Sequence, residues 1–307
     1  MTELTKRLLT ALVAVPLLIC FIVLGDPAGN FWFTDIRHFG LPFLGLINVV
    51  IFLGLWEFYK IIEARGLKPM KVVGIIGGLL VGFLAHFSNG YLMTVVLTAT
   101  ILLVMTIQLS KKDISTAITG ISVTIFGVIY IAWLLSHIIL LRNFGQELEN
   151  EYHYTGQVLE QFPGGRDIGL FFVLLVIACT FLNDTGAYFT GKIWGKRKLV
   201  PRISPKKTWE GAIGGVVVCT ITAVVIRLIF VFPFKIVYCL LLGFLIGVVA
   251  IFGDLVESLL KRDAKIDDAG GLLPGHGGFM DRLDSLLFTI PLTYYYVKIY
   301  YYTQMVE

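Results

Sequence analysis

Charged side chains are scarce in this chain of 307 residues. Asp, Glu, Lys and Arg together make up 15% of it, against about 25% in soluble domains. Apolar residues reach 57%, and the mean hydropathy is +0.83. The shortage of charge excludes an ordinary soluble enzyme, and the excess of apolar residues predicts an integral membrane protein.

Cysteine is also rare. The four cysteines, Cys20, Cys179, Cys219 and Cys239, all lie inside apolar runs and form no CxxC pair. This pattern supports neither a disulfide framework nor a zinc site. We therefore expect the four thiols to be small buried hydrophobic groups.

Low-complexity linkers and internal repeats are absent as well, which favours a single integral membrane domain over residues 1–307. The predicted helices of the first half contain few polar groups. We expect residues 1–167 to be mainly scaffold helices and residues 168–307 to carry the catalytic helices and cytoplasmic loops.

Apolar stretches of the length that crosses a bilayer, roughly 17–25 residues, predict an all-α, polytopic membrane protein with about nine transmembrane helices. The expected spans are Leu8–Leu24, Leu41–Tyr59, Val72–Phe87, Tyr91–Leu109, Ile118–Leu141, Ile168–Phe189, Ala212–Phe232, Ile236–Leu260 and Leu283–Tyr300. The first stretch also fits a cleaved signal peptide. We favour a retained helix because no clear small-x-small cleavage site follows it.

Most of the 25 lysines and arginines fall in alternate connections between these predicted helices. Basic residues gather in the cytoplasmic loops of membrane proteins, so the pattern predicts a cytoplasmic N-terminus and a C-terminus on the opposite side. The acidic segment 142–167 would then lie outside. We expect a multi-pass protein of the inner (cytoplasmic) membrane.

The most concentrated charge stands in the segment Ser258–Asp284. Asp254, Ser258 and Lys261 follow an i, i+4, i+7 spacing and so share one face of a predicted helix. Asp281 and Asp284 share a face at the start of the next one. Charge against a membrane helix is costly unless it pairs, binds a metal or binds a charged ligand. This segment is therefore the first candidate for a functional site.

A third carboxylate, Asp184, stands in the predicted helix Ile168–Phe189, next to Asn183 and Thr185. A hydrogen-bonded helix kink would explain these polar residues without any ligand. Counted from Ile168, however, Asp184 lies about 24 Å along the helix at about 1.5 Å per residue, near the cytoplasmic side of the bilayer. We therefore expect Asp184 to converge with the aspartates of the first candidate site.

The connection that follows, residues 191–210, is rich in lysine and arginine. Ser204, Lys206, Lys207 and Thr208 stand just before a helix predicted to begin near Thr208, and the amides of a helix N-terminus favour anions. The arrangement suits a phosphate group. Attraction to anionic lipid headgroups is an alternative, and both interpretations hold if the substrate is itself an anionic lipid.

Carboxylates beside lysine and arginine suit a hard divalent cation. Mg²⁺ takes one or two carboxylates and completes its coordination with water and substrate phosphates. Phosphoryl and nucleotidyl transfer depend mainly on positioning and charge neutralisation. Glycines such as Gly277 and Gly278 would let the backbone approach a phosphate chain closely. We expect Mg²⁺, with room for a second cation.

Three stretches resemble the phosphatidate cytidylyltransferase (CDP-diacylglycerol synthase) family. The first reads Ser258-x-x-Lys261-Arg262, Asp268 and His276-Gly277-Gly278-x-x-Asp281-Arg282-x-Asp284. The others read Asn183-Asp184-Thr185-Gly186-Ala187-Tyr188 and Ser204-Pro205-Lys206-Lys207-Thr208-x-Glu210-Gly211. The similarity covers about residues 183–284. Asp267 departs from the family pattern, which has Lys before Asp268, so we assign Asp267 no phosphate-binding role.

The resemblance implies transfer of CMP from CTP to phosphatidic acid. Asp254 and Asp281 would hold the metal, with Asp284 and Asp184 as additional ligands. The cations that neutralise phosphate would be Lys206, Lys207, Lys261, Arg262 and Arg282. Further substrate-binding residues would be Asn183, Ser204, Thr208, Ser258, His276, Gly277 and Gly278, although His276 equally fits a turn. The implied partners are CTP, phosphatidic acid from the inner leaflet and membrane lipids, without nucleic acid, and a homodimer is possible.

Two other functions fit parts of the pattern. A CTP-dependent lipid-alcohol kinase would also need a metal and a basic loop, but it must activate a neutral hydroxyl and would need a base. An ion-coupled transporter could bind a cation at Asp184 and Asp254. Transporter sites lie near the midplane of the bilayer, whereas the polar residues here gather at one membrane face.

Overall fold

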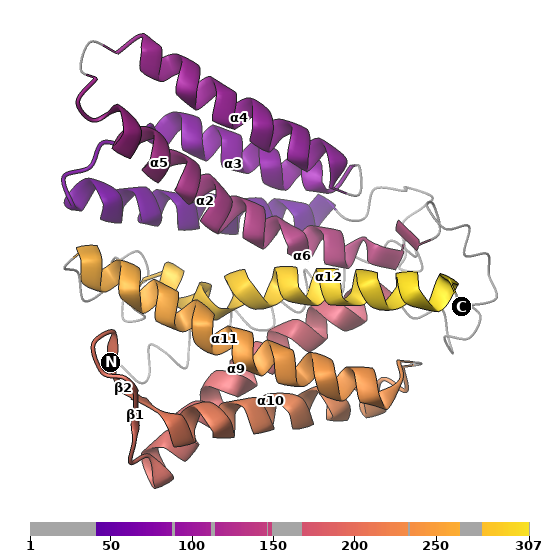
Figure 1. Cartoon of the computed structure of the whole chain (residues 1–307). Helices are drawn as coiled ribbons and strands as arrows, with labels where there is room; N and C mark the ends of the chain where they lie inside the picture. The colour runs from indigo at the N-terminus through magenta and orange to yellow at the C-terminus, as the bar shows by residue number, and fades with distance from the viewer. Residues whose placement is uncertain are drawn as a thin grey trace, which may run out of the picture. The chain divides into compact units, whose positions relative to one another are not determined.

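The computed structural model of the chain describes residues 41–87, 90–111, 114–145, 147–148, 168–232, 234–264 and 278–306. This part of the chain is mostly helical (Figure 1). It divides into two compact units. The first comprises Met1–Leu140 with Asp263–Asp281, and the second comprises Leu141–Arg262 with Arg282–Glu307.

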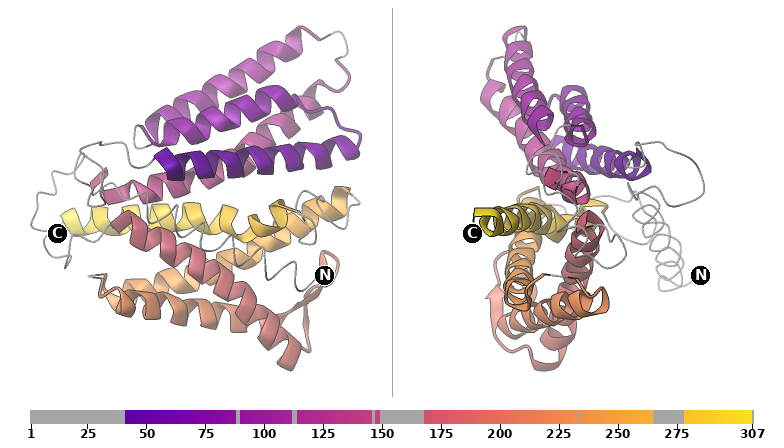
Figure 2. Two further views of the ribbon diagram at one scale, coloured as in Figure 1. Left: turned by 180° about the vertical axis from the view of Figure 1, so that it is seen from behind. Right: turned by 90° about the vertical axis from the view of Figure 1, so that its right-hand side faces the viewer.

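The first unit is a group of apolar helices. Its elements are α2 (Leu41–Ala64), α3 (Lys71–Ala85), α4 (Tyr91–Leu109), α5 (Ala117–Gly127), the π-helical turn η1 (Val128–Trp133) and the start of α6 (Leu134–Arg142). Helices α3 and α4 lie side by side (Figure 2). A Cβ atom at Gly74 would lie 2.1 Å from the Tyr59 hydroxyl oxygen, and one at Gly78 would lie 2.4 Å from Leu55 Cδ1. These glycines therefore allow the close approach of α3 to α2.

The second unit carries most of the predicted site. Its elements are α9 (Ile168–Trp194), strands β1 (Lys198–Val200) and β2 (Ser204–Thr208), α10 (Trp209–Ile229), α11 (Ile236–Ala264) and α12 (Asp284–Val306), which follows the 3₁₀ turn η2 (Met280–Arg282). Helices α9 and α10 pack closely. A Cβ atom at Gly211 would lie 2.8 Å from the Ala187 carbonyl oxygen, and one at Gly215 would lie 2.8 Å from that of Asn183.

Six of the described helical segments are long and apolar enough to cross a membrane: Leu41–Ala64, Tyr91–Leu109, Ala117–Arg142, Ile168–Trp194, Trp209–Ile229 and Ile236–Ala264. The chain is thus a helical, multi-pass membrane protein. The predicted span Val72–Phe87 appears as the shorter apolar helix α3. The span Leu283–Tyr300 appears as α12, whose many tyrosines lower its hydropathy. The predicted span Leu8–Leu24 lies outside the described residues.

The expectation of an all-α protein is corrected at one place, the hairpin of β1 and β2. The two strands are antiparallel and pair Lys198 with Thr208 and Val200 with Ser204. The carboxylate of Glu210 accepts hydrogen bonds from the backbone amides of Lys196 (3.1 Å) and Arg197 (3.2 Å). Glu210 thereby fixes the start of the hairpin to the first turn of α10.

Helix α10 begins where the sequence predicts it. Thr208 is its N-cap residue, and the Thr208 hydroxyl accepts a hydrogen bond of 3.1 Å from the Gly211 amide. A capping hydroxyl satisfies an amide that has no partner within the helix. The cap lies directly after Lys206 and Lys207, so it fixes these two lysines relative to α10.

Candidate functional site

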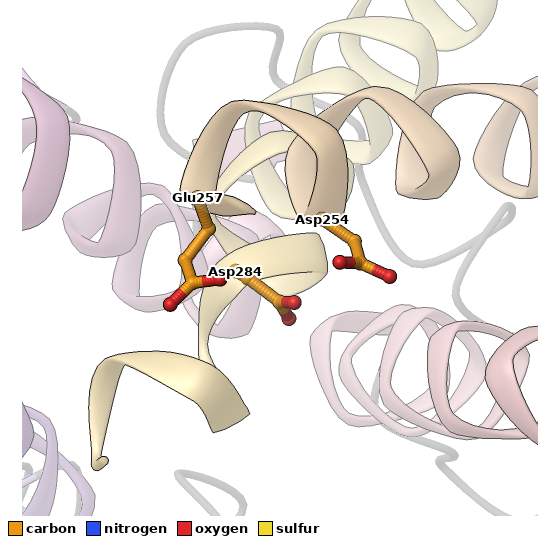
Figure 3. A group of neighbouring side chains, drawn as sticks. All are labelled: Asp254, Glu257 and Asp284. Atoms are coloured by element: carbon orange, nitrogen blue, oxygen red, sulfur yellow. The ribbon is translucent and has the colours of Figure 1, made fainter. Parts of the chain in front are cut away.

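Three carboxylates of the second unit form one group. Asp254 and Glu257 belong to α11, and Asp284 opens α12. One ligand oxygen from each lies within 4.8 Å of the other two. In Figure 3 the Asp254 and Glu257 side chains leave the same face of α11, and the Asp284 carboxylate lies between them. When ionised, three carboxylates this close repel one another unless cations are near.

The group forms because α11 and α12 meet at a glycine. A Cβ atom at Gly253 would lie 2.6 Å from the Asp284 carbonyl oxygen and 2.9 Å from Ser285 Cα. The Ser285 hydroxyl also donates a hydrogen bond of 3.2 Å to the Ala250 carbonyl. The backbone contact at Gly253 thus places its neighbour Asp254 beside Asp284.

Two lysines lie against this group. Lys207 Nζ lies 2.5 Å from Asp254 Oδ2, with the two side chains 23% and 32% exposed. Lys261 Nζ lies 3.1 Å from Glu257 Oε1. Partly buried pairs are screened less by salt than fully exposed ones. The site therefore holds acid and base in direct contact, in a setting where charge interactions are stronger than at an open surface.

A cavity of about 390 Å³ opens beside the Lys207–Asp254 pair. Its volume lies within the usual range for small-molecule sites, about 300–1,000 Å³. Six of the predicted site residues line it: Asn183, Asp184, Lys206, Lys207, Thr208 and Asp254. The predicted meeting of Asp184, the basic connection and Asp254 at one place is therefore seen in the described second unit.

Other predicted residues do not line the cavity. The Ser258 hydroxyl lies 3.4 Å from Asp254 Oδ1 and donates a hydrogen bond to it. Ser204 opens β2. Arg262, in the last turn of α11, and Arg282, in the turn before α12, are exposed. The contacts of these residues with phosphate therefore stay predictions.

Asp281 belongs to the first unit. Its Oδ2 atom accepts a hydrogen bond of 3.3 Å from the Gly278 amide. The role of Asp281 as a metal ligand stays a prediction that depends on its place three residues before Asp284. His276 and Gly277 lie outside the described residues.

Glu257 is the site residue that the sequence analysis missed. Its side chain is buried, and it joins Asp254 and Asp284 in the carboxylate group, whereas Asp184 faces the neighbouring cavity. The spacing of Asp254 and Glu257, three residues apart in a predicted helix, puts both on one face. This spacing was the signal that could have identified it.

The donor set fits a hard divalent cation. Carboxylate oxygens are the protein ligands that Mg²⁺ prefers, and the three in this group are close enough to share one ion. The Asp254 carboxylate already contacts a cation, the ammonium of Lys207. The Asp254 carboxylate of this group is therefore paired with a positive charge.

We expect Gly253→Ala to loosen the contact between α11 and α12. The added methyl group would overlap the backbone at Asp284, and overpacking costs about 1–3 kcal/mol. The thermal midpoint in detergent should fall, and activity should fall with it. Gly45→Ala is the matched control, since a Cβ atom at Gly45 meets no atom within 4 Å. An unchanged midpoint in Gly253→Ala would contradict the contact.

Comparison with known proteins gives a consistent result. The family described as "Cytidylyltransferase family" matches residues 5–300. A phosphatidate cytidylyltransferase of Synechocystis sp. is 32% identical over 302 residues, covering 95% of this chain and 96% of the relative. One of Bacillus subtilis is 31% identical over 308 residues, covering 98% and 100%. The chloroplastic phosphatidate cytidylyltransferase 4 of Arabidopsis thaliana is 32% identical over 259 residues, covering 81% and 65%.

Proposed function

The chain belongs to the cytidylyltransferase family, and from this premise we propose that it transfers CMP from CTP to phosphatidic acid. The products are CDP-diacylglycerol and pyrophosphate. Beside the relatives, the observation that carries the proposal is the cavity where Lys207 meets Asp254. Lysines that can bind phosphate lie there beside carboxylates that can bind a cation, in the helical part of a membrane protein.

The reaction needs charge neutralisation more than proton transfer. A phosphate monoester has a second pKa of about 6 and is mostly dianionic at neutral pH. An oxygen of phosphatidic acid therefore attacks the α-phosphorus of CTP without a general base. A new P–O bond forms, the bond from the α-phosphorus to the bridging oxygen breaks, and pyrophosphate leaves with the bonding electrons. The main obstacle is repulsion between the two anions.

The side chains divide this task by charge. Lys206 and Lys207 line the cavity and hold the triphosphate. Lys261, Arg262 and Arg282 neutralise the lipid phosphate and the departing pyrophosphate. Asn183, Ser204, Thr208, Ser258 and the segment His276–Gly278 contact the substrates.

The carboxylates Asp254, Asp284 and Glu257 would hold Mg²⁺, with Asp184 and Asp281 as further ligands and with room for a second cation. A bound Mg²⁺ would supply positive charge to neutralise the phosphate groups of the substrates. The carboxylates fix its position, and the lysine that pairs with Asp254 remains available to the anions.

The enzyme works at the inner membrane with its active site towards the cytoplasm. The basic connection between α9 and α10 supports this placement, because such segments face the cytoplasm. CTP enters from the cytoplasm, and phosphatidic acid comes from the inner leaflet. The proposal also includes one membrane domain of nine transmembrane helices with a cytoplasmic N-terminus. It further includes assembly as a homodimer.

Product analysis tests the function. Purified protein in detergent is incubated with labelled CTP, phosphatidic acid and Mg²⁺. The proposed reaction yields CDP-diacylglycerol and pyrophosphate, whereas a CTP-dependent lipid-alcohol kinase would release CDP. A transporter would give neither product. Absence of CDP-diacylglycerol and pyrophosphate would overturn the proposal.

We expect Glu257→Gln to raise the Mg²⁺ concentration for half-maximal activity about 10–100-fold, the usual range for residues that support a metal site. The amide keeps the shape of the side chain but loses the negative charge. The rate of CDP-diacylglycerol formation against Mg²⁺ concentration measures this. Asp263→Asn, at an exposed position of the same helix, is the control. An unchanged Mg²⁺ dependence would exclude Glu257 from the metal site.

A further inference from the structure

Glu57 is a buried carboxyl group in a helix of the half that we expected to serve as scaffold. It lies in α2, one of the segments able to cross a membrane, and its exposure is 0%. Burying a carboxylate is costly unless polar partners compensate it, and an ionisable residue inside a membrane helix suggests a function. The contacts of Glu57 within the first unit indicate which function.

The carboxylate of Glu57 contacts the turn that carries Asp281. Glu57 Oε2 accepts a hydrogen bond of 3.0 Å from the Met280 backbone amide, 223 residues further along the chain. Met280 itself is 2% exposed. A hydrogen bond from an amide to an ionised carboxylate is about twice as strong as a neutral one. Burial of both partners protects it from competition by water.

Asp281 is held within the same turn. Its Oδ2 atom accepts a hydrogen bond of 3.3 Å from the Gly278 amide, and Met280 is its direct neighbour in the chain. Fixing the Met280 amide therefore also fixes the backbone from which the Asp281 side chain extends. A long-range hydrogen bond between buried groups thus connects α2 to this turn.

We propose that Glu57 is a positioning residue, which anchors the 278–281 turn to α2 and so holds Asp281 in place for the reaction. The proposal depends on the proposed function, in which Asp281 is a metal ligand. It gives α2 a part in catalysis beyond that of scaffold. Glu57 acts through the backbone and has no contact with substrate.

The experiment compares Glu57→Leu and Glu57→Gln with Glu63→Leu and Glu63→Gln. Glu63 is the matched control, because it lies on the same helix but forms an exposed ion pair of 3.2 Å with Lys71. All variants are first checked for a single gel-filtration peak in detergent. Hydrogen–deuterium exchange of peptides that contain Met280 is then measured without substrate or metal, and activity is measured against Mg²⁺ concentration.

In Glu57→Leu the Met280 amide loses its acceptor, so we expect its exchange to be at least about tenfold faster. The Mg²⁺ concentration for half-maximal activity should rise about 10–100-fold. Glu57→Gln keeps an oxygen acceptor, so its Mg²⁺ requirement should stay closer to that of the wild type. Both Glu63 variants should match the wild type in both measurements.

Two results would overturn the proposal. One is unchanged exchange at Met280 in Glu57→Leu. The other is faster exchange with an unchanged Mg²⁺ requirement and turnover. If Glu57→Leu does not fold, Glu57→Gln tests the proposal. Its hydrogen bond to the Met280 amide is neutral and weaker, so we expect exchange at Met280 to be about threefold faster or more. Exchange equal to that of the wild type would overturn the anchoring role of Glu57. Failure of the wild type to form CDP-diacylglycerol would overturn the proposed function. Hydrogen–deuterium exchange at Met280 would still show whether Glu57 anchors the turn.

Discussion

Replacing Asp254 by Asn is expected to lower kcat/KM for CDP-diacylglycerol formation about 10³-fold. Loss of one preorganised electrostatic group commonly costs about 10²–10³-fold, and Asp254 acts twice. It belongs to the carboxylate group, and it is the ion-pair partner of Lys207 at 2.5 Å. The amide retains the shape of the side chain but not its charge. Formation of labelled CDP-diacylglycerol at several Mg²⁺ concentrations measures the effect.

Asp263→Asn is a suitable control for Asp254→Asn. It makes the same chemical change on the same helix, at a side chain that is 69% exposed, so its activity should equal that of the wild type. Near-normal turnover with unchanged Mg²⁺ dependence in Asp254→Asn would remove Asp254 from the metal site. The same comparison with Asp281→Asn tests whether Asp281 is a metal ligand, a role predicted from the sequence.

Replacing Lys207 by Gln is expected to lower kcat/KM about 10²-fold, the range seen when one group that stabilises developing charge is removed. Lys207 lines the cavity and pairs with Asp254, so the variant loses a cation for the triphosphate. It also leaves the carboxylate group with less compensating charge. Initial rates with CTP and with phosphatidic acid varied separately show which substrate is affected.

Lys198→Gln is the matched control for Lys207→Gln. Lys198 lies on the other strand of the same hairpin, is exposed and does not line the cavity. If both variants lost activity equally, the effect would come from the net charge of the hairpin, as expected for attraction to anionic lipid. A loss confined to Lys207 assigns the effect to the cavity.

Local signals in the sequence predicted much of the second unit. The start of α10 near Thr208 was predicted, and its cap agrees with the preference of helix N-termini for hydroxyl side chains. The spacing of Gly211 and Gly215 is typical of close contacts between membrane helices. The depth of Asp184, counted along its apolar helix, predicted that it meets the aspartates of the first candidate site, and it lines one cavity with Asp254. Each of these signals lies within about one helix or at one helix end.

Features that depend on contacts between distant segments escaped prediction. Whether Glu257 joins Asp254 or faces elsewhere depends on where α12 packs, and the glycine contact at Gly253 decides that. The hairpin was missed because its strands have three and five residues, and β2 contains Pro205, which disfavours a strand. The hydrogen bond from Met280 to Glu57 joins residues too far apart in sequence for any periodicity to indicate.

The Glu210 carboxylate joins the hairpin of β1 and β2 to α10. Its hydrogen bonds to the Lys196 and Arg197 amides, together with the bond of 2.9 Å from the Trp209 amide to the Arg197 carbonyl, close the base of the hairpin against α10. The base of the hairpin is therefore hydrogen-bonded to the first turn of α10. We therefore expect a shift of the first turn of α10 to move the strand that carries Lys206 and Lys207.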